Sequence, residues 1–204
     1  MKLDILSNEQ IVRAARDKLA QGAWDYLVGG TESETTMRRN RAAFDRIAFR
    51  PRVLRDMSAV DPSTTFLGHR LRIPVMLAPM GSLHVFTPEG GVAAAQAAAK
   101  FETMHVVSSV TGSELEEIAA CADGPKAFQL YVTGDWAWIE EIIARVKQAG
   151  YAALCLTVDS AHYSRRERPM MSGWAPPTRR KPPDPSHLAS LTWETMDRIK
   201  ELAG

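Results

Sequence analysis

The sequence has little of what marks several large classes of protein. Only two cysteines occur in 204 residues, so neither a disulfide framework nor a cysteine-rich metal site is predicted. Basic and acidic side chains nearly balance, at 25 against 24, which excludes a dedicated nucleic-acid binder. No apolar run reaches the roughly 18 residues of a membrane span, and the first ten residues lack the apolar centre of a secretory signal. These absences favour a cytoplasmic globular protein without membrane attachment.

Motifs for phosphate and metal binding are also missing. The glycine pairs at 29–30 and 90–91 fit neither GxGxxG nor GxxxxGKS/T, so no dinucleotide fingerprint or P-loop is predicted. The five histidines lie far apart without the spacing of metal ligands. We therefore expect no metal site.

Residues 1–72 are predicted to form a helical and irregular N-terminal segment that ends in a hairpin. Apolar residues follow helical spacing over 8–29, and a polar helix is expected over 31–44. A tight hairpin is predicted over 66–72, centred on Gly68. The remainder of the chain, 73–204, forms the second predicted segment.

From residue 73, short apolar runs alternate with helical patterns. Runs without polar alternation are typical of strands covered on both faces. The four runs cover residues 74–80, 105–110, 127–132 and 152–158. The helices after the first three runs have start signals at Thr87 with Pro88, at Ser113 and at Asp135. Four successive βα units predict a parallel sheet, which fits either an open doubly wound sheet or the first half of a (β/α)₈ barrel.

A long loop over 160–191 separates the fourth strand from a last helix over 192–203. The loop is rich in proline and carries the basic cluster Arg165, Arg166 and Arg168. Most exposed arginines are simply solvated, but loops of this length commonly serve as lids. A guanidinium in such a lid can bind both oxygens of a carboxylate. We expect a mobile lid here.

Polar side chains stand at the carboxyl ends of the predicted strands, where both architectures bind ligands. A single polar residue there often only caps the next helix, but an amide in an apolar run, such as Gln129, needs hydrogen-bond partners. Together these residues predict a flat, polar-edged ligand lying across the strand ends. The candidates are Pro79, Met80, Gly81, Ser108, Ser109, Gln129, Tyr131, Thr157 and Asp159.

Seven collinear segments resemble the family of FMN-dependent 2-hydroxy-acid oxidases and dehydrogenases, which includes glycolate oxidase, lactate oxidase and mandelate dehydrogenase. The resemblance implies an α/β fold of the (β/α)₈ barrel type, with about the first four βα units in this chain, and FMN as the cofactor. The segments are 24–30 with 34–36 and 40, 49–54, 74–79, 84–90, 108–109, 128–131, and 156–159 with 165–166.

The resemblance also implies roles for individual residues toward the flavin. Three residues would lie with their backbone beside the reactive N5 edge, and three would hydrogen-bond the isoalloxazine ring. The first group is Pro79, Met80 and Gly81, and the second is Ser108, Gln129 and Thr157.

On the substrate side, Tyr26 and Arg166 match the carboxylate binders of the family. Tyr131 matches an active-site tyrosine near the substrate hydroxyl, and Asp159 matches the aspartate that orients the catalytic histidine. The implied reaction is oxidation of a small 2-hydroxy acid to the 2-oxo acid. The substrate side chain and the choice between oxidase and dehydrogenase stay open.

The catalytic histidine and the phosphate-binding segment of this family belong to the second half of the barrel. Open sheet edges and an uncovered apolar interior invite pairing with another chain. We therefore expect a complementary C-terminal half-barrel or self-association, and a homo-oligomer when the barrel is complete. The alternative is a non-catalytic half-barrel that binds flavin or serves as an interaction module.

Overall fold

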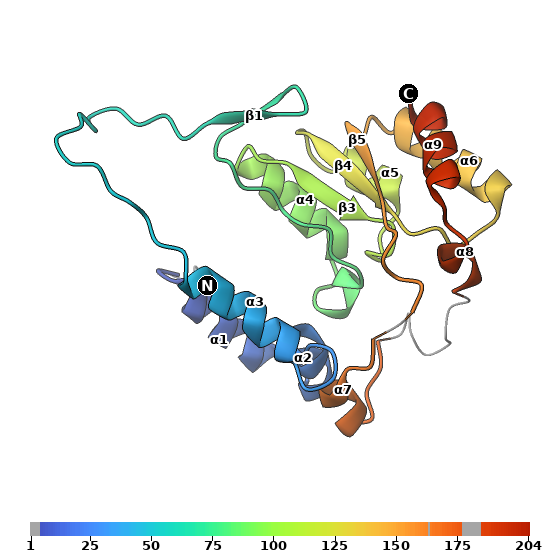
Figure 1. The fold of residues 1–204 in the computed structure, drawn as a ribbon, viewed down its shortest axis with the longest axis horizontal. Coiled ribbons are helices and arrows are strands. Elements are labelled where there is room, and N and C mark those ends of the chain that lie inside the picture. Colours follow the sequence, from blue (N-terminus) through green and yellow to red (C-terminus); the bar gives the residue numbers. More distant parts are fainter. Residues whose placement is uncertain (1–4, 163, 177–184) are drawn as a thin grey trace. The chain divides into compact units, whose positions relative to one another are not determined.

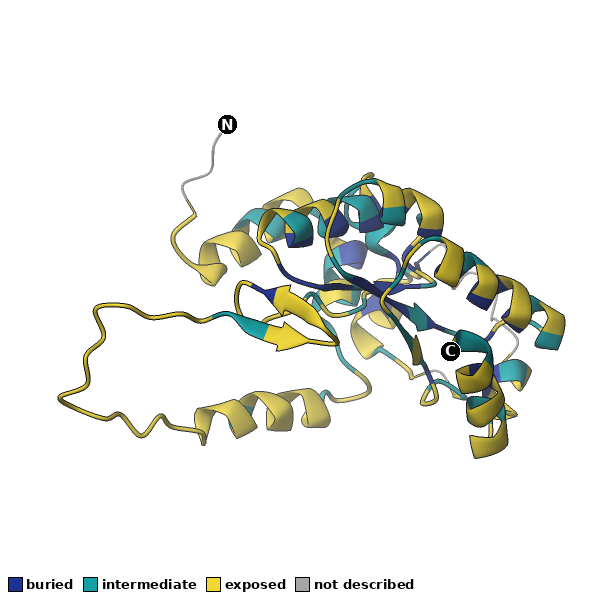
Figure 2. Cartoon of the chain, turned by 90° about the horizontal axis from the view of Figure 1, so that it is seen from above, coloured by how far each residue is buried: buried dark blue, intermediate teal, exposed yellow. Residues whose placement is uncertain are grey.

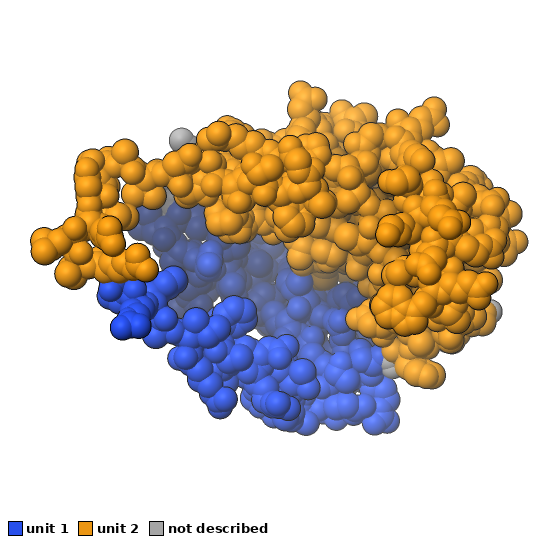
Figure 3. All heavy atoms as spheres, turned by 45° about the horizontal axis from the view of Figure 1, so that its top comes forward, with its two compact units in different colours: residues 1–51, 164–181 blue, residues 52–163, 182–204 orange. Residues whose placement is uncertain are grey.

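The computed structural model describes residues 5–162, 164–176 and 185–204, which form two compact units. Unit 1 comprises the described parts of 1–51 and 164–181, and unit 2 those of 52–163 and 182–204 (Figure 3). The segment from residue 164, distant in the sequence, therefore groups with the N-terminal helices.

The described part of unit 1 contains four helices. The expected helix over 8–29 is two helices, α1 (Asn8–Lys18) and α2 (Gln21–Val28), because the chain is extended at Leu19, with φ −88° and ψ 136°. The polar helix is α3 (Thr35–Asp45), and α7 (Glu167–Met171) lies in the long loop and contacts α2.

The predicted hairpin is present in unit 2. Strands β1 (Thr64–Phe66) and β2 (His69–Leu71) pair antiparallel across a turn at Leu67 and Gly68. Gly68 has φ +77°, a conformation that favours glycine. The buried Leu71 side chain packs against Met104 and Ala127 of the parallel sheet.

The sheet of unit 2 is parallel, with β3 (His105–Ser108), β4 (Lys126–Leu130) and β5 (Ala153–Leu156) in that order (Figure 1). The run over 74–80 was expected to be a full strand, but it joins β3 only by a parallel bridge at Leu77. The Leu77 N–H donates to Met104 O at 2.9 Å. Pro79, two residues after Leu77 and in register to donate next, has no N–H, which shortens the ladder on this edge.

Helices follow the strands and form one connected layer. Helix α4 contacts α5, α5 contacts α6, and α6 contacts α9. The helical elements of unit 2 are η1 (Leu83–Val85), α4 (Gly90–Lys100), α5 (Leu115–Ala120), α6 (Trp136–Gln148), α8 (Ser186–Ala189) and α9 (Trp193–Ala203).

Strand order excludes the open architectures that the sequence left possible. The order is the Leu77 segment, β3, β4, β5, so each strand lies beside the next one in the chain. Both common doubly wound orders reverse direction within the first four strands. A progression without reversal is the order of strands in a barrel.

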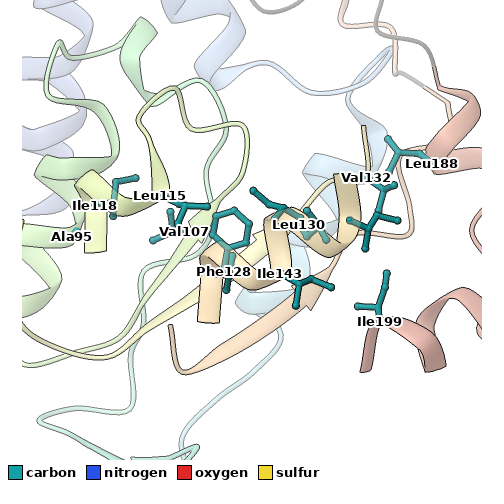
Figure 4. Packing of buried hydrophobic residues seen from close by; sticks show 13 residues of the cluster. Ala95, Val107, Leu115, Ile118, Phe128, Leu130, Val132, Ile143, Leu188 and Ile199 are labelled. Carbon is teal, nitrogen blue, oxygen red and sulfur yellow. The ribbon is translucent and has the colours of Figure 1, made fainter. Parts of the chain in front are cut away.

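Unit 2 has its hydrophobic core between the sheet and the helices. Phe128 on the central strand is 2% exposed and packs with Val107, Leu130 and Ile143 in one cluster (Figure 4). The edge of the Tyr151 ring contacts the Phe128 ring, with centroids 5.4 Å apart. Figure 2 shows β3 and β4 mostly buried and the hairpin mostly exposed. Across the described residues, every helix is too short or too polar to cross a bilayer.

Candidate functional site

Strand register brings the predicted polar residues of β3 and β4 side by side. Ser108 lies opposite Gln129, and Gln129 lies opposite Cys155 of β5. Because successive side chains of a strand point to opposite faces, these three share one face of the sheet. The residues directly before them in the three strands, Val107, Phe128 and Leu154, pack in the core on the helix side of the sheet. The shared face is therefore the one turned away from the helices.

The same face changes from apolar to polar along the strands. Two residues before the polar row, Val106 pairs with Ala127, and Ala127 pairs with Ala153. This apolar row packs around Leu71 of the hairpin. Hydrogen-bonding groups are therefore confined to the carboxyl ends of the strands.

Two of the polar side chains have no hydrogen-bond partner among the residues that the structure describes. The Thr157 N–H donates to Leu130 O at 2.9 Å, which continues the ladder past β5, but its Oγ1 is buried without a hydrogen bond. The half-buried Gln129 amide has no side-chain partner among the described residues. An unpaired buried polar group costs about 1–3 kcal/mol. A ligand with a hydrogen-bonding edge fits both groups.

Residues Pro79, Met80 and Gly81 lie in the loop after the Leu77 bridge. The loop is tied to the chain beyond β3, because the Ser82 N–H donates to Val110 O at 2.8 Å. A Cβ atom on Gly81 would lie 3.1 Å from Val110 Cγ2, so the two segments are in close contact.

Tyr131 and Asp159 follow the ends of β4 and β5. The Tyr131 N–H donates to Ser109 Oγ at 3.0 Å, and its ring is half-buried at the margin of the core. Asp159 is exposed, and its Oδ1 accepts from Ser160 Oγ at 3.2 Å. Within the described part of the chain, no basic side chain pairs with Asp159.

The other predicted pair, Tyr26 and Arg166, is brought together in unit 1. Arg166 Nη1 donates to the Tyr26 carbonyl at 2.9 Å, and the guanidinium carbon stands 4.7 Å from the Tyr26 ring centroid. The Trp174 ring packs on Tyr26 as well, with centroids 5.5 Å apart. Arg166 is thus a half-buried, stacked side chain.

The neighbouring arginines form ion pairs that the sequence did not indicate. Arg165 binds both carboxylate oxygens of Glu32, and Arg168 binds both of Glu34. The hydrogen bond from Arg168, followed by that from the Gly30 N–H, lowers the pKa of Glu34. Opposite charges separated by more than 130 residues carry no local signal, so sequence reasoning missed both pairs. The lid expected over 160–191 lies partly outside the described residues, at 163 and 177–184.

His105 is a buried titratable group on the helix side of β3. Among the described residues, its Nδ1 has no hydrogen-bond partner. Burial first, and the nearby Lys126 ammonium second, lower the pKa of His105 to about 4. Lys126 itself donates to the carbonyls of Ala122 and Gly124.

The stability of unit 2 is expected to fall on mild acidification. The unfolded chain takes up a proton on His105 near pH 6.5 and the folded chain only near pH 4, so stability falls as pH drops through this window. Lowering the pH from 7 to 5 should cost about 2 kcal/mol. Urea unfolding at the two pH values measures this loss. His105→Gln should remove most of this pH-dependent loss of stability, and His69→Gln on the exposed hairpin should leave the loss unchanged. Equal losses in the wild type and both variants would show that His105 does not cause the pH dependence.

The described residues hold no group of three or more His, Cys, Asp or Glu side chains that could bind a metal ion. The polar groups at the strand ends are uncharged amides and hydroxyls, apart from the exposed Asp159. They suit a neutral hydrogen-bonding heterocycle better than a cation.

Sequence comparison finds one matching family and many relatives. The model of the FMN-dependent dehydrogenase family matches residues 15–201. Glycolate oxidase 1 of Zea mays is 40% identical over 183 residues, which cover 90% of this chain and 47% of that protein. Glycolate oxidase of Spinacia oleracea is 38% identical over 165 residues, 81% of this chain and 45% of that protein. The chain spans about half the length of the curated relatives it matches.

Comparison with solved structures finds enzymes that act on hydroxy acids as well. A crystal structure of mandelate oxidase superposes with a TM-score of 0.87 at 32% identity, covering 97% of this chain and 60% of that one. The G81A mutant of an active chimera of (S)-mandelate dehydrogenase superposes with a TM-score of 0.86 at 27% identity, covering 95% of this chain and 61% of that one. A mandelate oxidase variant in this set carries an FMN adduct.

Proposed function

The chain belongs to the FMN-dependent dehydrogenase family, and from this membership we propose that it takes part in the FMN-dependent oxidation of a small 2-hydroxy acid to the 2-oxo acid. The observation that carries the proposal is the polar row at the strand ends. Ser108 and Gln129 stand in register on the open face, and Thr157 Oγ1 is buried without a partner.

These residues fit an isoalloxazine ring. Its pyrimidine edge alternates hydrogen-bond donors and acceptors, and an amide such as Gln129 offers both kinds of group. The Ser108 and Thr157 hydroxyls can also donate or accept. The proposed FMN contacts of this chain are the side chains of Ser108, Gln129 and Thr157 and the backbone of Pro79, Met80 and Gly81.

When bound, FMN supplies a two-electron acceptor for the hydrogen on C2 of the substrate. We assign Tyr26 and Arg166 to the substrate carboxylate, since a guanidinium can bind both of its oxygens. Tyr131 is proposed to contact the substrate hydroxyl. Asp159 is proposed to orient a histidine base from the remaining half of the fold, which agrees with its lack of a basic partner among the described residues.

We propose that residues 73–204 form about the first four βα units of a (β/α)₈ barrel. Consecutive strand order and a single connected helix layer support this architecture. The segment 1–72 is proposed to precede the barrel as a helical and irregular part that ends in the hairpin.

The free edge of β5 is the proposed attachment point for the rest of the barrel. A groove of about 790 Å³ runs between β5 and α9, lined mainly by apolar side chains such as Leu156, Val158 and Met196. Trp193 beside it is 80% exposed. A parallel strand with apolar side chains would pair with β5 and cover this groove. A complementary half-barrel is the proposed occupant, and self-association is the alternative to test by size-exclusion chromatography. A homo-oligomer is proposed for the complete barrel.

The visible spectrum of added FMN tests the proposed function. We expect FMN to bind the chain, and sodium glycolate or (S)-mandelate to bleach the bound flavin once the second half of maize glycolate oxidase is supplied. If FMN binds but neither acid bleaches it, with or without the added second half, the chain is a non-catalytic flavin-binding chain. If FMN binds neither to the chain alone nor to the chain with the second half added, the proposal is overturned.

A further inference from the structure

Arg166 sits between two arginines that are each held by a carboxylate. Arg165 Nε and Nη2 donate to Glu32 at 2.9 and 3.1 Å, and Arg168 Nε and Nη2 donate to Glu34 at 2.5 and 2.6 Å. Both contacts use the planar fork of arginine, which fixes direction as well as distance. The residue directly before Arg166 and the residue two positions after it are therefore tied to the segment between α2 and α3.

Backbone contacts reinforce both ties. The Glu32 N–H donates to Arg165 O at 2.9 Å, and the Gly30 N–H donates to Glu34 Oε1 at 3.1 Å. The Glu34 side chain is 12% exposed, whereas those of Arg165 and Arg168 are 72% and 47% exposed. Glu34 is thus a shielded anchor, and such a pair holds its geometry better than an exposed pair.

Arg166 keeps most of its hydrogen-bonding capacity. A guanidinium carries five N–H donors, and one of them is used by the Tyr26 carbonyl. Arg165 and Arg168 each donate two N–H groups to a carboxylate, Glu32 and Glu34 respectively, so their charge is already paired. Within the described part of unit 1, Arg166 is the member of this cluster left able to receive an anion.

We propose that Glu32 and Glu34 are positioning residues, which hold Arg166 on the Tyr26 ring and keep its neighbours from competing for the substrate carboxylate. This inference rests on the proposed function, in which Arg166 binds that carboxylate. Arginine loses considerable rotamer freedom when it is fixed. Because Arg165 and Arg168 are already fixed, less conformational entropy is lost in this segment when substrate binds.

Residue-resolved arginine modification tests the proposal in the full chain. Phenylglyoxal reacts with accessible guanidinium groups, and peptide mass spectrometry gives a rate for each arginine, with and without sodium (S)-mandelate. The test variant is Glu34→Gln, which removes the charge at nearly constant shape. The matched control is Glu9→Gln, which breaks the exposed Glu9–Arg13 pair on α1, 3.0 Å long and not connected to Arg166.

In Glu34→Gln we expect Arg166 to react about fivefold faster and to lose its protection by mandelate. In Glu9→Gln the Arg166 rate should be unchanged. Arg16, which stacks on Trp24 at 5.5 Å, reports on the fold of the unit and should keep its rate in both variants. Arg168→Lys keeps the charge but loses the fork, so an intermediate Arg166 rate is expected.

An unchanged Arg166 rate in Glu34→Gln, with Arg16 still protected, would overturn the inference. If Glu34→Gln also exposes Arg16, the fold is lost and Glu32→Gln decides by the same two rates. A wild-type Arg166 that mandelate does not protect would count against the proposed function alone, because the rate difference between the variants does not require ligand.

Discussion

Phe128→Ala is expected to destabilise unit 2 by about 3–5 kcal/mol. Phe128 lies on the central strand, is 2% exposed, and packs against the Tyr151 ring and the helix-side cluster. Its removal leaves a cavity lined by Val107, Leu130 and Ile143, which the close-packed layer can fill only in part. Urea unfolding followed by circular dichroism measures the loss.

Phe101→Ala is the matched control in the same unit. Phe101 follows α4 and is 56% exposed, so its truncation should cost well under half as much. Comparable losses for the two variants would show that the sheet–helix layer is not the core of this unit.

Gly112→Ala should destabilise the loop after β3 by about 3–5 kcal/mol, because two effects add. Gly112 has φ +101°, which L-residues rarely adopt. An added Cβ would also stand 1.9 Å from His84 Nδ1. The His84 ring cannot move freely, since its Nδ1 is 3.2 Å from Thr111 O.

Two further variants separate strain from the clash. Gly68 has φ +77°, but a Cβ added there would meet no atom within 4 Å. Gly68→Ala should therefore show the conformational cost alone, about 1 kcal/mol of unfolding free energy. Adding His84→Ala to Gly112→Ala removes the obstacle and should recover part of the loss. Equal unfolding free energies for Gly112→Ala and Gly68→Ala would refute the close approach of His84.

Local signals predicted most elements of unit 2. Asp135 caps α6 at the predicted position by accepting from the Trp138 N–H, and α9 begins at Trp193, one residue after the predicted start at Thr192. Two other start signals were misplaced. Thr87 donates its hydroxyl to the Glu89 carboxylate within a turn, so α4 begins only at Gly90. Helix α5 begins at Leu115 rather than directly after Ser113.

The site residues also divide into those whose placement follows from local patterns and those whose contacts are long-range. A shared face for Ser108 and Gln129 follows from strand patterning and parallel pairing, both of which can be read locally. The resemblance paired Arg166 with Tyr26, and the two residues are in contact. Local patterns could not predict the ion pairs of Arg165 with Glu32 and of Arg168 with Glu34, because the partners lie far apart in the chain. From the sequence alone, an arginine-rich loop is expected to be solvated. Whether each of its arginines is paired or free depends on carboxylates more than 130 residues away.

Titration of FMN into the chain, compared between two variants, tests the central claim most directly. Gln129→Leu removes the unpartnered amide from the open face, and Gln96→Leu makes the same change on the exposed side of α4. The account predicts FMN binding about tenfold or more weaker in Gln129→Leu and unchanged in Gln96→Leu. Equal FMN affinity in the two variants would contradict a flavin site at the carboxyl ends of these strands.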